Sequence, residues 1–213
     1  MGRTRRVSQI LTAQKEPLVR AGLRYLLNRQ QDMKVVAEAG SGEQAVRKFL
    51  QHRPDLALVE MDLPGMGGLE VLRSVRRKIP SARVIILTDR EGDEDVYRAI
   101  QAGAQAYVFK DANEDEVLET IRAVRQGVAK IAPRVATKLA ARVRRSALTE
   151  RELQVLRQVV AGRSNKEIGS SLKVKEGTVK VHVNHIMKKL GVRGRTEAVT
   201  TALKRGLVHL PEL

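Results

Sequence analysis

Residues 55–70 read DLALVEMDLPGMGGLE, and this stretch decides the fold. Its apolar run, Leu56–Val59, has the length of a buried strand, and it ends abruptly at Glu60 and Asp62, before a Pro-Gly turn and a pair of glycines. In α/β proteins, carboxylates at the end of a buried strand usually lie at the functional edge of the sheet. The stretch therefore predicts either a working acidic site or the remnant of one.

The same rhythm continues on both sides of this stretch, because short apolar or β-branched runs alternate with amphipathic helical segments as far as Gly127. Capping boxes or close variants support two of these helices, through the pairs Ser41 with Gln44 and Asn113 with Glu116. We expect strands at Val7–Thr12, Lys34–Ala37, Leu56–Val59, Arg83–Leu87 and Ala106–Phe109. Five strand–helix units predict a parallel sheet with helices on both faces.

No strand pattern follows Gly127. Residues 128–146 are rich in Ala and Arg and predict a partly helical linker. Four helices are expected at Thr149–Ala161, Ser164–Leu172, Lys175–Leu190 and Thr196–Gly206. The first two begin with S/T-x-x-E capping boxes, and glycines that favour helix ends stand at positions 162, 191 and 206. Short helices joined by tight turns predict a helix-turn-helix unit.

The two halves of the chain differ in their balance of basic and acidic residues. Up to Gly127 the chain has 21 Lys and Arg against 18 Asp and Glu, whereas from Val128 onward it has 19 against 6. This imbalance favours a polyanionic partner for the second half over a merely soluble basic surface. The sequence has no cysteine, which excludes disulfides and thiolate metal sites. Since no apolar run reaches the ~18 residues of a membrane span, we expect a cytoplasmic protein.

The third helix of the basic half has two distinct faces when it is wound at about 3.6 residues per turn. One is an apolar stripe of Val179, Val183, Ile186, Met187 and Leu190. The opposite face carries Gly177, Val181, Asn184, His185 and Lys188, with Lys180 beside it. An apolar Val181 suits a major groove, where it can contact a thymine methyl group. The alternatives are an ordinary basic helical bundle and, for His182 with His185, a zinc site, which lacks any nearby carboxylate or thiolate.

Residues 148–199 resemble the LuxR-type C-terminal DNA-binding domain through L-T-x-R-E, S-N-K-E-I, T-V-K-x-H and K-L-x-V-x-x-R-T-E-A. The resemblance implies double-stranded DNA, in pseudo-palindromic or tandem half-sites, as the partner, and a homodimer. Lys180, Val181 and Asn184 occupy the base-reading positions. One departure is Lys175, where the family usually has a small capping residue. The full set of expected DNA contacts is Asn165, Lys166, Thr178, Lys180, Val181, Asn184, His185, Lys188 and Lys189.

The first half resembles the receiver domain of NarL/FixJ response regulators, through PLVRAGLRYLL, PDLALVEMDLPGMGGLE, VIILT and AGAQAYVFKDA. The resemblance implies a doubly wound (βα)5 fold with strand order 2-1-3-4-5. Thr88, Tyr107 and Lys110 fill the switch threonine, switch aromatic and phosphate-binding lysine positions. The expected domains are a receiver at residues 1–127, a linker at 128–146 and a DNA-binding domain at 147–213.

The catalytic carboxylates of the family do not match. Gln14 and Lys15 stand where two acidic residues close the first strand, and Glu60 stands at the phosphoacceptor aspartate. Mg²⁺ requires near-ideal oxygen geometry at about 2.0–2.1 Å, which a neutral amide, a lysine and a longer carboxylate do not offer. We therefore expect no metal, no cofactor and no enzymatic activity, and a receiver that acts without phosphorylation. One hypothesis is that Lys15, Lys110 and Glu60 form a metal-free ion-pair cluster. The other hypothesis is that Glu60 is a solvated loop carboxylate with no role beyond solubility.

Several alternatives stay open from the sequence. One alternative is a phosphorylation-activated regulator in which Asp62 or another group accepts the phosphoryl group. A second alternative is an interaction adaptor whose DNA-binding half is vestigial. Ser8 follows two arginines in a pattern that basic-directed kinases favour, although it also begins the first strand. An unknown protein or small ligand can supply the input at the receiver.

Overall fold

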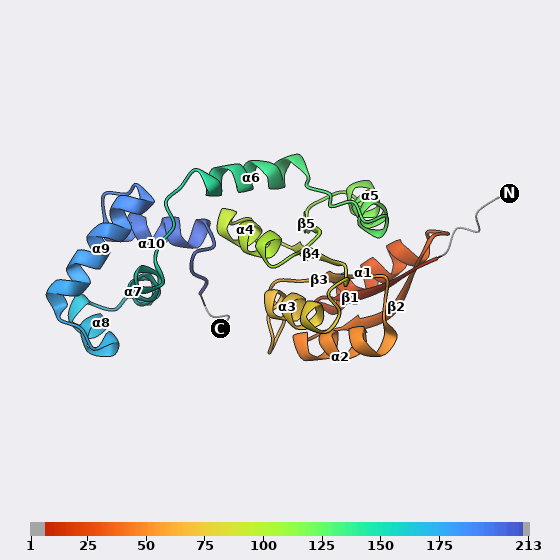
Figure 1. Ribbon diagram of the computed structural model, residues 1–213, viewed down its shortest axis with the longest axis horizontal. Coiled ribbons are helices and arrows are strands. Elements are labelled where there is room, and N and C mark those ends of the chain that lie inside the picture. Colours follow the sequence, from red (N-terminus) through yellow and green to blue (C-terminus); the bar gives the residue numbers. More distant parts are fainter. Residues whose placement is uncertain (1–6, 211–213) are drawn as a thin grey trace. The chain divides into compact units, whose positions relative to one another are not determined.

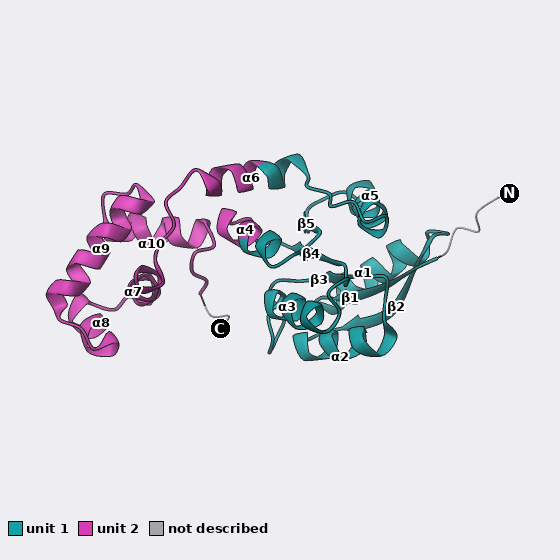
Figure 2. Cartoon of the chain, viewed as in Figure 1, with its two compact units in different colours: residues 1–90, 98–136 teal, residues 91–97, 137–213 magenta. Residues whose placement is uncertain are grey.

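The computed structural model describes residues 7–210 and divides into two compact units (Figure 2). Unit 1 takes the chain up to Arg90 together with Arg98–Ala136, and unit 2 takes Glu91–Tyr97 together with the chain from Thr137 onward. The first turn of one receiver helix therefore belongs to unit 2. In the part of the chain that is described, no helix is long and apolar enough to span a bilayer.

Unit 1 is built on a parallel sheet with the order β2-β1-β3-β4-β5, which confirms the predicted doubly wound topology (Figure 1). Its strands are short, and β3 to β5 are buried along their whole length, as expected where helices cover both faces. The strands are β1 (Ser8–Ala13), β2 (Met33–Ala39), β3 (Leu56–Val59), β4 (Val84–Thr88) and β5 (Ala106–Phe109). Ser8 is buried in β1, although the preceding arginines lie outside the described residues.

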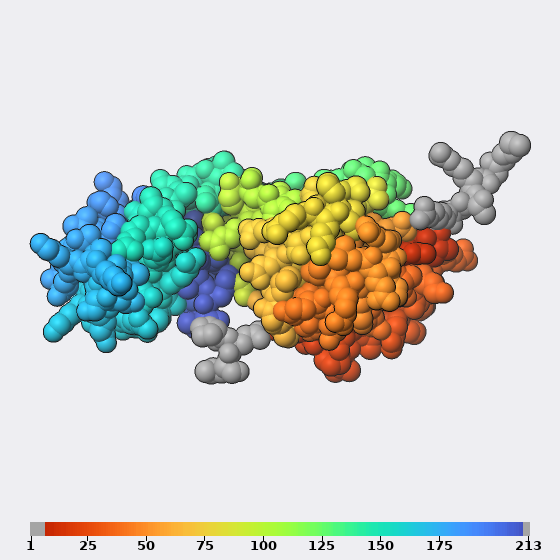
Figure 3. All heavy atoms as spheres, turned by 60° about the horizontal axis from the view of Figure 1, so that its bottom comes forward, coloured from red at the N-terminus to blue at the C-terminus, as the bar shows by residue number. Residues whose placement is uncertain are grey.

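Helices follow each strand: α1 (Pro17–Asn28), α2 (Gly42–His52), α3 (Gly68–Lys78), α4 (Asp93–Gln101) and α5 (Glu114–Arg125). The expected caps form, since Ser41 accepts a bond from the Gln44 amide and Asn113 accepts one from the Glu116 amide. One core cluster joins strand residues to α1 and α5, for example Ile85 to Leu27 and Ile121. In Figure 3, α2 (orange) and α3 (yellow) lie side by side at the surface of unit 1.

The second glycine of the pair in residues 55–70, Gly68, is required by the packing of α3 against the end of β3. A Cβ atom on Gly68 would lie 2.1 Å from the backbone oxygen of Glu60, so only glycine lets α3 begin this close to the end of β3. The Gly68 amide donates to the Met61 oxygen at 2.9 Å. The close approach fixes the backbone on which Glu60 and Asp62 stand.

Unit 2 is helical, with α6 (Pro133–Val143) entering it, followed by α7 (Glu150–Val160), α8 (Asn165–Leu172), α9 (Glu176–Leu190) and α10 (Arg195–Lys204). Both predicted capping boxes are present, at Thr149 with Glu152 and at Ser164 with Glu167. Gly162, Gly191 and Gly206 have positive φ just beyond helix ends, also as predicted. The core of α7 to α10 is formed by Val155, Leu156, Val159, Ile168, Val179, Ile186, Ala202, Leu207 and Val208.

Unit 2 contains a cluster of buried carboxylates that the sequence did not predict. Asp93, Glu94 and Asp95, here called the acidic turn, are each at most 7% exposed. Their partners come from α6 and the turn after it, and from the segment that follows α10. Arg145 and Arg205 bind Asp93, Arg142 binds Glu94, and His209 binds Asp95 at 2.9 Å. Gly206 allows this packing, because a Cβ atom there would lie 1.9 Å from Asp95 Oδ2.

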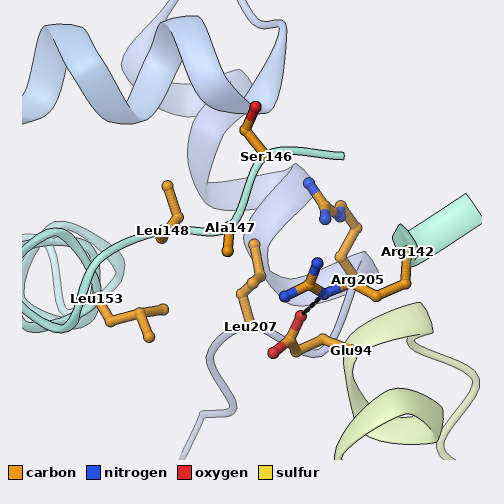
Figure 4. A pocket seen from close by; sticks show the side chains of 8 residues that line it. All are labelled: Glu94, Arg142, Ser146, Ala147, Leu148, Leu153, Arg205 and Leu207. Carbon is orange, nitrogen blue, oxygen red and sulfur yellow. Dashed lines mark hydrogen bonds and ion pairs between the residues drawn. The ribbon is translucent and has the colours of Figure 1, made fainter. Parts of the chain in front are cut away.

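Figure 4 shows Glu94 of the acidic turn with Arg142 and Arg205 around a small cavity. Arg142 points its guanidinium at the Glu94 carboxylate, and the Glu94 amide donates to the Arg205 oxygen at 3.0 Å. The cavity has a volume of about 20 Å³ and is closed on its other side by Leu148, Leu153 and Leu207. This is room for a single water molecule, so the acidic turn is part of the packed interior of unit 2.

Candidate functional site

The face of α9 that was predicted to read DNA is exposed. Val181 is 51% exposed although it is apolar, and its neighbours on this face are exposed as well: Thr178, Lys180, Asn184, His185 and Lys188. The opposite stripe packs inward through the fully buried Val179 and Ile186. The helical wheel therefore divides α9 as expected, into a core side and an open side that carries both cations and an apolar contact.

Lys180 is held loosely on this face. Its Nζ lies 3.2 Å from Glu176 Oε1, one turn earlier in α9, and both side chains are about half exposed or more. An exposed pair of this kind is worth about 0.3–0.5 kcal/mol, so it does not prevent Lys180 from reaching another partner. No side chain caps the start of α9, because Lys175 stands at the N-cap position. This is the cost expected of the departure from the family pattern.

Lys189, in contrast, is turned toward the domain core. Its Nζ binds the buried Glu152 at 2.7 Å, and Glu152 also accepts from the Thr149 amide in the α7 capping box. Burial by itself raises the pKa of Glu152, but the bonds from Lys189 and Thr149 outweigh it and lower the pKa. The structure thus gives Lys189 a structural partner, and its predicted DNA contact stays a prediction.

The turn between α8 and α9 adds basic groups that sequence reasoning missed. A hollow of about 450 Å³ is lined there by Lys166, Lys173 and Lys175 among others. Lys173 has a left-handed backbone with φ 55°, which turns the chain from α8 into α9. Asn165, at the start of α8, accepts a 3.2 Å bond from Arg195 of α10, so its predicted contact position is fixed by a second helix. The signal that could have identified Arg195 was its place in the R-T-E-A motif.

The receiver site centres on Glu60, whose side chain is 0% exposed at the end of β3. Its Oε1 accepts from Lys110 Nζ at 2.5 Å, and its Oε2 accepts from the backbone amide of Lys15 at 3.1 Å. Lys110 Nζ also donates to Glu16 Oε2 at 3.0 Å. The ammonium of Lys110 therefore bridges two carboxylates, an arrangement here called the Glu16–Lys110–Glu60 bridge.

Charge is distributed unevenly over this bridge. Burial raises the pKa of Glu60, and the bonds from Lys110 and Lys15 only partly offset it. Burial tends to lower the pKa of Lys110, but its two carboxylate partners raise it overall. Burial by itself raises the pKa of Glu16, but its hydrogen bonds, the one from Lys110 foremost, together outweigh burial and lower the pKa. The raised pKa of Lys110 and the lowered pKa of Glu16 favour a protonated Lys110 beside an ionised Glu16, whereas the raised pKa of Glu60 disfavours its charged form.

Compared with the predicted cluster, the bridge differs in one member. The contact of Lys15 with Glu60 is made by its backbone amide, and the second charged member of the bridge is Glu16, which sequence reasoning missed. Gln14 lies beside Glu60 because Ala13 of β1 pairs with Val59 of β3. Gln14 is fully buried, and its carboxamide has no partner among the described residues. No group of three or more His, Cys, Asp or Glu side chains within residues 7–210 is placed to hold a metal ion.

A second network occupies the loops beside Glu60. Arg90 forms a two-bond ion pair with Asp62, and its backbone oxygen accepts a 2.7 Å bond from the Tyr107 hydroxyl. Its amide donates to Thr88 Oγ1 at 3.2 Å. Thr88 and Tyr107, the two predicted switch positions, are thus brought together by Arg90, a residue that no motif had marked.

Comparisons with known proteins cover both units. The family model "Response regulator receiver domain" matches residues 10–122, and the model "Bacterial regulatory proteins, luxR family" matches residues 146–202. Similar proteins of Bacillus subtilis (strain 168) are the "Uncharacterized transcriptional regulatory protein YxjL", 35% identical with 94% of this chain and 97% of the relative covered, and the "Transcriptional regulatory protein LiaR", 35% identical with 94% and 99% covered.

Solved structures agree with these matches. The response regulator ChrA of a heme-sensing two-component system is 34% identical, with a TM-score of 0.57 over 95% of this chain and 99% of that chain. The response regulator RcsB in a complex with DNA is 20% identical, with a TM-score of 0.71 over 93% and 98%, and this likeness supports the fold alone.

Proposed function

The chain belongs to the response regulators that carry a luxR-family regulatory domain, and on this premise we propose that it regulates transcription by binding double-stranded DNA, with a receiver that acts without phosphorylation. No catalytic role is proposed for it. The observation that carries the DNA-binding part is the open face of α9, where Lys180 and Asn184 flank the exposed apolar Val181.

This face suits the major groove for a chemical reason. Asn184 offers a donor and an acceptor to an adenine edge, Lys180 donates to guanine, and Val181 meets a thymine methyl group. Lys188, with Asn165 and Lys166 at the start of α8, supplies contacts to phosphates, which position a protein without specifying sequence. Proteins of this kind commonly bind as dimers on half-sites about one helical turn apart, so we propose a homodimer on pseudo-palindromic or tandem half-sites.

The DNA-binding proposal is tested by salt titration of the full chain on a DNA site selected from random sequence. A protein that neutralises several phosphates loses affinity steeply as salt rises. We expect this dependence, together with a preference for the selected site over scrambled DNA. Weak binding that neither depends on salt nor prefers a sequence would favour the alternative of an interaction adaptor with a vestigial DNA-binding half.

The Glu16–Lys110–Glu60 bridge supports the second part of the proposal. The ammonium of Lys110 bridges two carboxylates beside the position that the resemblance gives to the incoming phosphoryl group, and each oxygen of Glu60 already accepts a hydrogen bond. The buried carboxamide of Gln14 offers a neutral oxygen where the family has an acid. A divalent ion would therefore have to displace a bound cation and bind fewer charged ligands. We infer that the bridge holds the receiver in one conformation and that input comes from an unknown protein or ligand.

Phosphorylation independence is tested by incubating the chain with acetyl phosphate and Mg²⁺ and measuring its mass. We expect no gain of a phosphoryl group. As a positive control, the double variant Lys15→Asp with Glu60→Asp restores two acids at the site, and we expect it to bind Mg²⁺ and gain mass. Labelling of the unmodified chain at Asp62 would support the phosphorylation-activated alternative, although the ion pair with Arg90 already engages both Asp62 oxygens.

A further inference from the structure

The Asp62–Arg90 ion pair connects two loops that come from different strands. Asp62 lies after β3 and Arg90 lies after β4, and the guanidinium uses two of its nitrogens to bind both oxygens of the carboxylate. Each side chain is only about a fifth exposed, at 22% and 23%. A paired geometry of this kind gives orientation as well as attraction, and partial burial protects it from screening.

The backbone of Arg90 forms hydrogen bonds with two hydroxyl groups. Its amide donates to Thr88 Oγ1 at 3.2 Å, and its oxygen accepts from the Tyr107 hydroxyl at 2.7 Å. Tyr107 is 1% exposed and packs its ring edge-on against Phe109, with ring centres 5.4 Å apart. A buried tyrosine hydroxyl needs a partner, and here it donates to the backbone oxygen of the residue whose side chain pairs with Asp62.

We infer that the Asp62–Arg90 ion pair is a latch that keeps Tyr107 buried and fixes the segment Thr88–Arg90. When the pair opens, Arg90 no longer has a fixed position, the Tyr107 hydroxyl loses its acceptor, and the ring gains access to solvent. The inference goes beyond the proposed function, because it gives the receiver a conformational control that depends on neither Glu60 nor DNA. It also gives Asp62 a role other than that of a substitute phosphoacceptor.

Tyrosine fluorescence provides the test, because the chain has three tyrosines and no tryptophan. Replacing Tyr25 and Tyr97 by Phe leaves Tyr107 as the single emitter and keeps the rings that Arg29 and Arg142 stack on. In this background we expect weak quenching by acrylamide. Adding Asp62→Asn or Arg90→Gln should raise the quenching constant several-fold, while Arg90→Lys, which keeps the charge and loses the two-bond geometry, should give an intermediate value.

Arg24→Gln is the matched control, since it removes an exposed Arg–Glu pair on the same unit, with 2.9 Å between Arg24 and Glu38. It should leave the quenching constant unchanged. Moderate NaCl should leave Tyr107 protected in the parent background, because partial burial protects the Asp62–Arg90 ion pair from screening. The inference is wrong if Tyr107 stays protected in Asp62→Asn and Arg90→Gln chains whose circular dichroism is that of the parent, or if Arg24→Gln exposes it equally. The result is independent of DNA binding and of acetyl phosphate labelling, so failure of the latch and failure of the proposed function are separable.

Discussion

Lys110, which follows β5, reaches past β4 to place its Nζ 2.5 Å from Oε1 of Glu60 at the end of β3. The contact spans 50 residues of sequence, and it sets a fully buried carboxyl group against a cation that is itself mostly covered. Breaking such a pair from one side leaves an uncompensated buried charge, which is more costly than removing both partners.

Lys110→Met is accordingly expected to lower the free energy of unfolding by about 3–5 kcal/mol at pH 7. The pKa of Glu60 is already raised above the value 4.5 that it has when unfolded, and the substitution raises it further. Since a raised carboxyl pKa penalises the folded state above that pKa and no longer does so below the unfolded value, the deficit should shrink as the pH falls toward 4.5. Urea unfolding at a series of pH values measures this.

The double variant Lys110→Met with Glu60→Gln should recover most of the loss at neutral pH. Lys130→Met, which removes an exposed partner of Glu119, serves as the control and should change stability little. A deficit for Lys110→Met that stays constant with pH would contradict the account of a buried charge.

Arg142→Ala tests the acidic turn. Glu94 is buried and Arg142 is its cation, so the substitution should destabilise the chain by about 3–5 kcal/mol. Replacing the pair by Arg142→Met with Glu94→Leu should cost much less, because no charge is then left buried. Lys138→Ala, on the same helix with a 3.9 Å exposed partner in Glu91, is the matched control. Calorimetric unfolding distinguishes these variants, and equal effects of Arg142→Ala and Lys138→Ala would argue against a buried network.

Lys188 and Lys189 are adjacent in sequence and should behave differently. Lys189→Met removes the cation of Glu152, so we expect a loss of stability of about 1–3 kcal/mol at neutral pH. The loss should diminish as the pH falls, since the lowered pKa of Glu152 contributes stability above its unfolded value of 4.5 that disappears when it is protonated. Lys188→Ala should leave unfolding unchanged and reduce the salt slope of DNA binding by about 1. The reverse pattern would show that α9 is rotated relative to this account.

Asn184→Ala should relax the preference for one base position at a cost of about 1–3 kcal/mol in binding to the selected site. Val181→Ala should weaken binding mainly where a thymine is replaced by a base without the methyl group. Both changes are measured by repeating the site selection with the variant proteins. If every DNA sequence lost affinity equally, these side chains would be positioning groups and not readers of sequence.

The sequence predicts the elements of both units well, for a physical reason. Leu56–Val59 is apolar without interruption because β3 is covered on both faces, and Val179 and Ile186 repeat at helical spacing because α9 has one buried side. The capping residues Thr149 and Ser164 mark their helix starts through local bonds. Such signals are contained in a few consecutive residues, so no knowledge of tertiary structure is needed to find them.

The parts that the sequence does not predict depend on side chains that meet over long sequence separations. Glu16 joins Lys110 across 94 residues, and Arg90 joins Asp62 across 28. Neither Glu16 nor Arg90 belongs to a local sequence pattern. The sequence places Lys189 among the expected DNA contacts beside Lys188, and it does not show that a turn of about 100° along the helix also brings Lys189 within reach of Glu152. Long, flexible side chains at the border of a helical face are where a wheel diagram is least decisive.

The acidic turn changes the electric field that unit 2 presents to a distant charged molecule. Asp93 is paired with Arg145 and Arg205, Glu94 is paired with Arg142, and Glu152 is paired with Lys189. The isoelectric point of about 10.6 counts both members of each pair, but the acidic turn comes from the receiver half of the sequence and lies in unit 2. The net positive charge of unit 2, and with it the outward electric field, is therefore lower than the composition of residues 128–213 suggests.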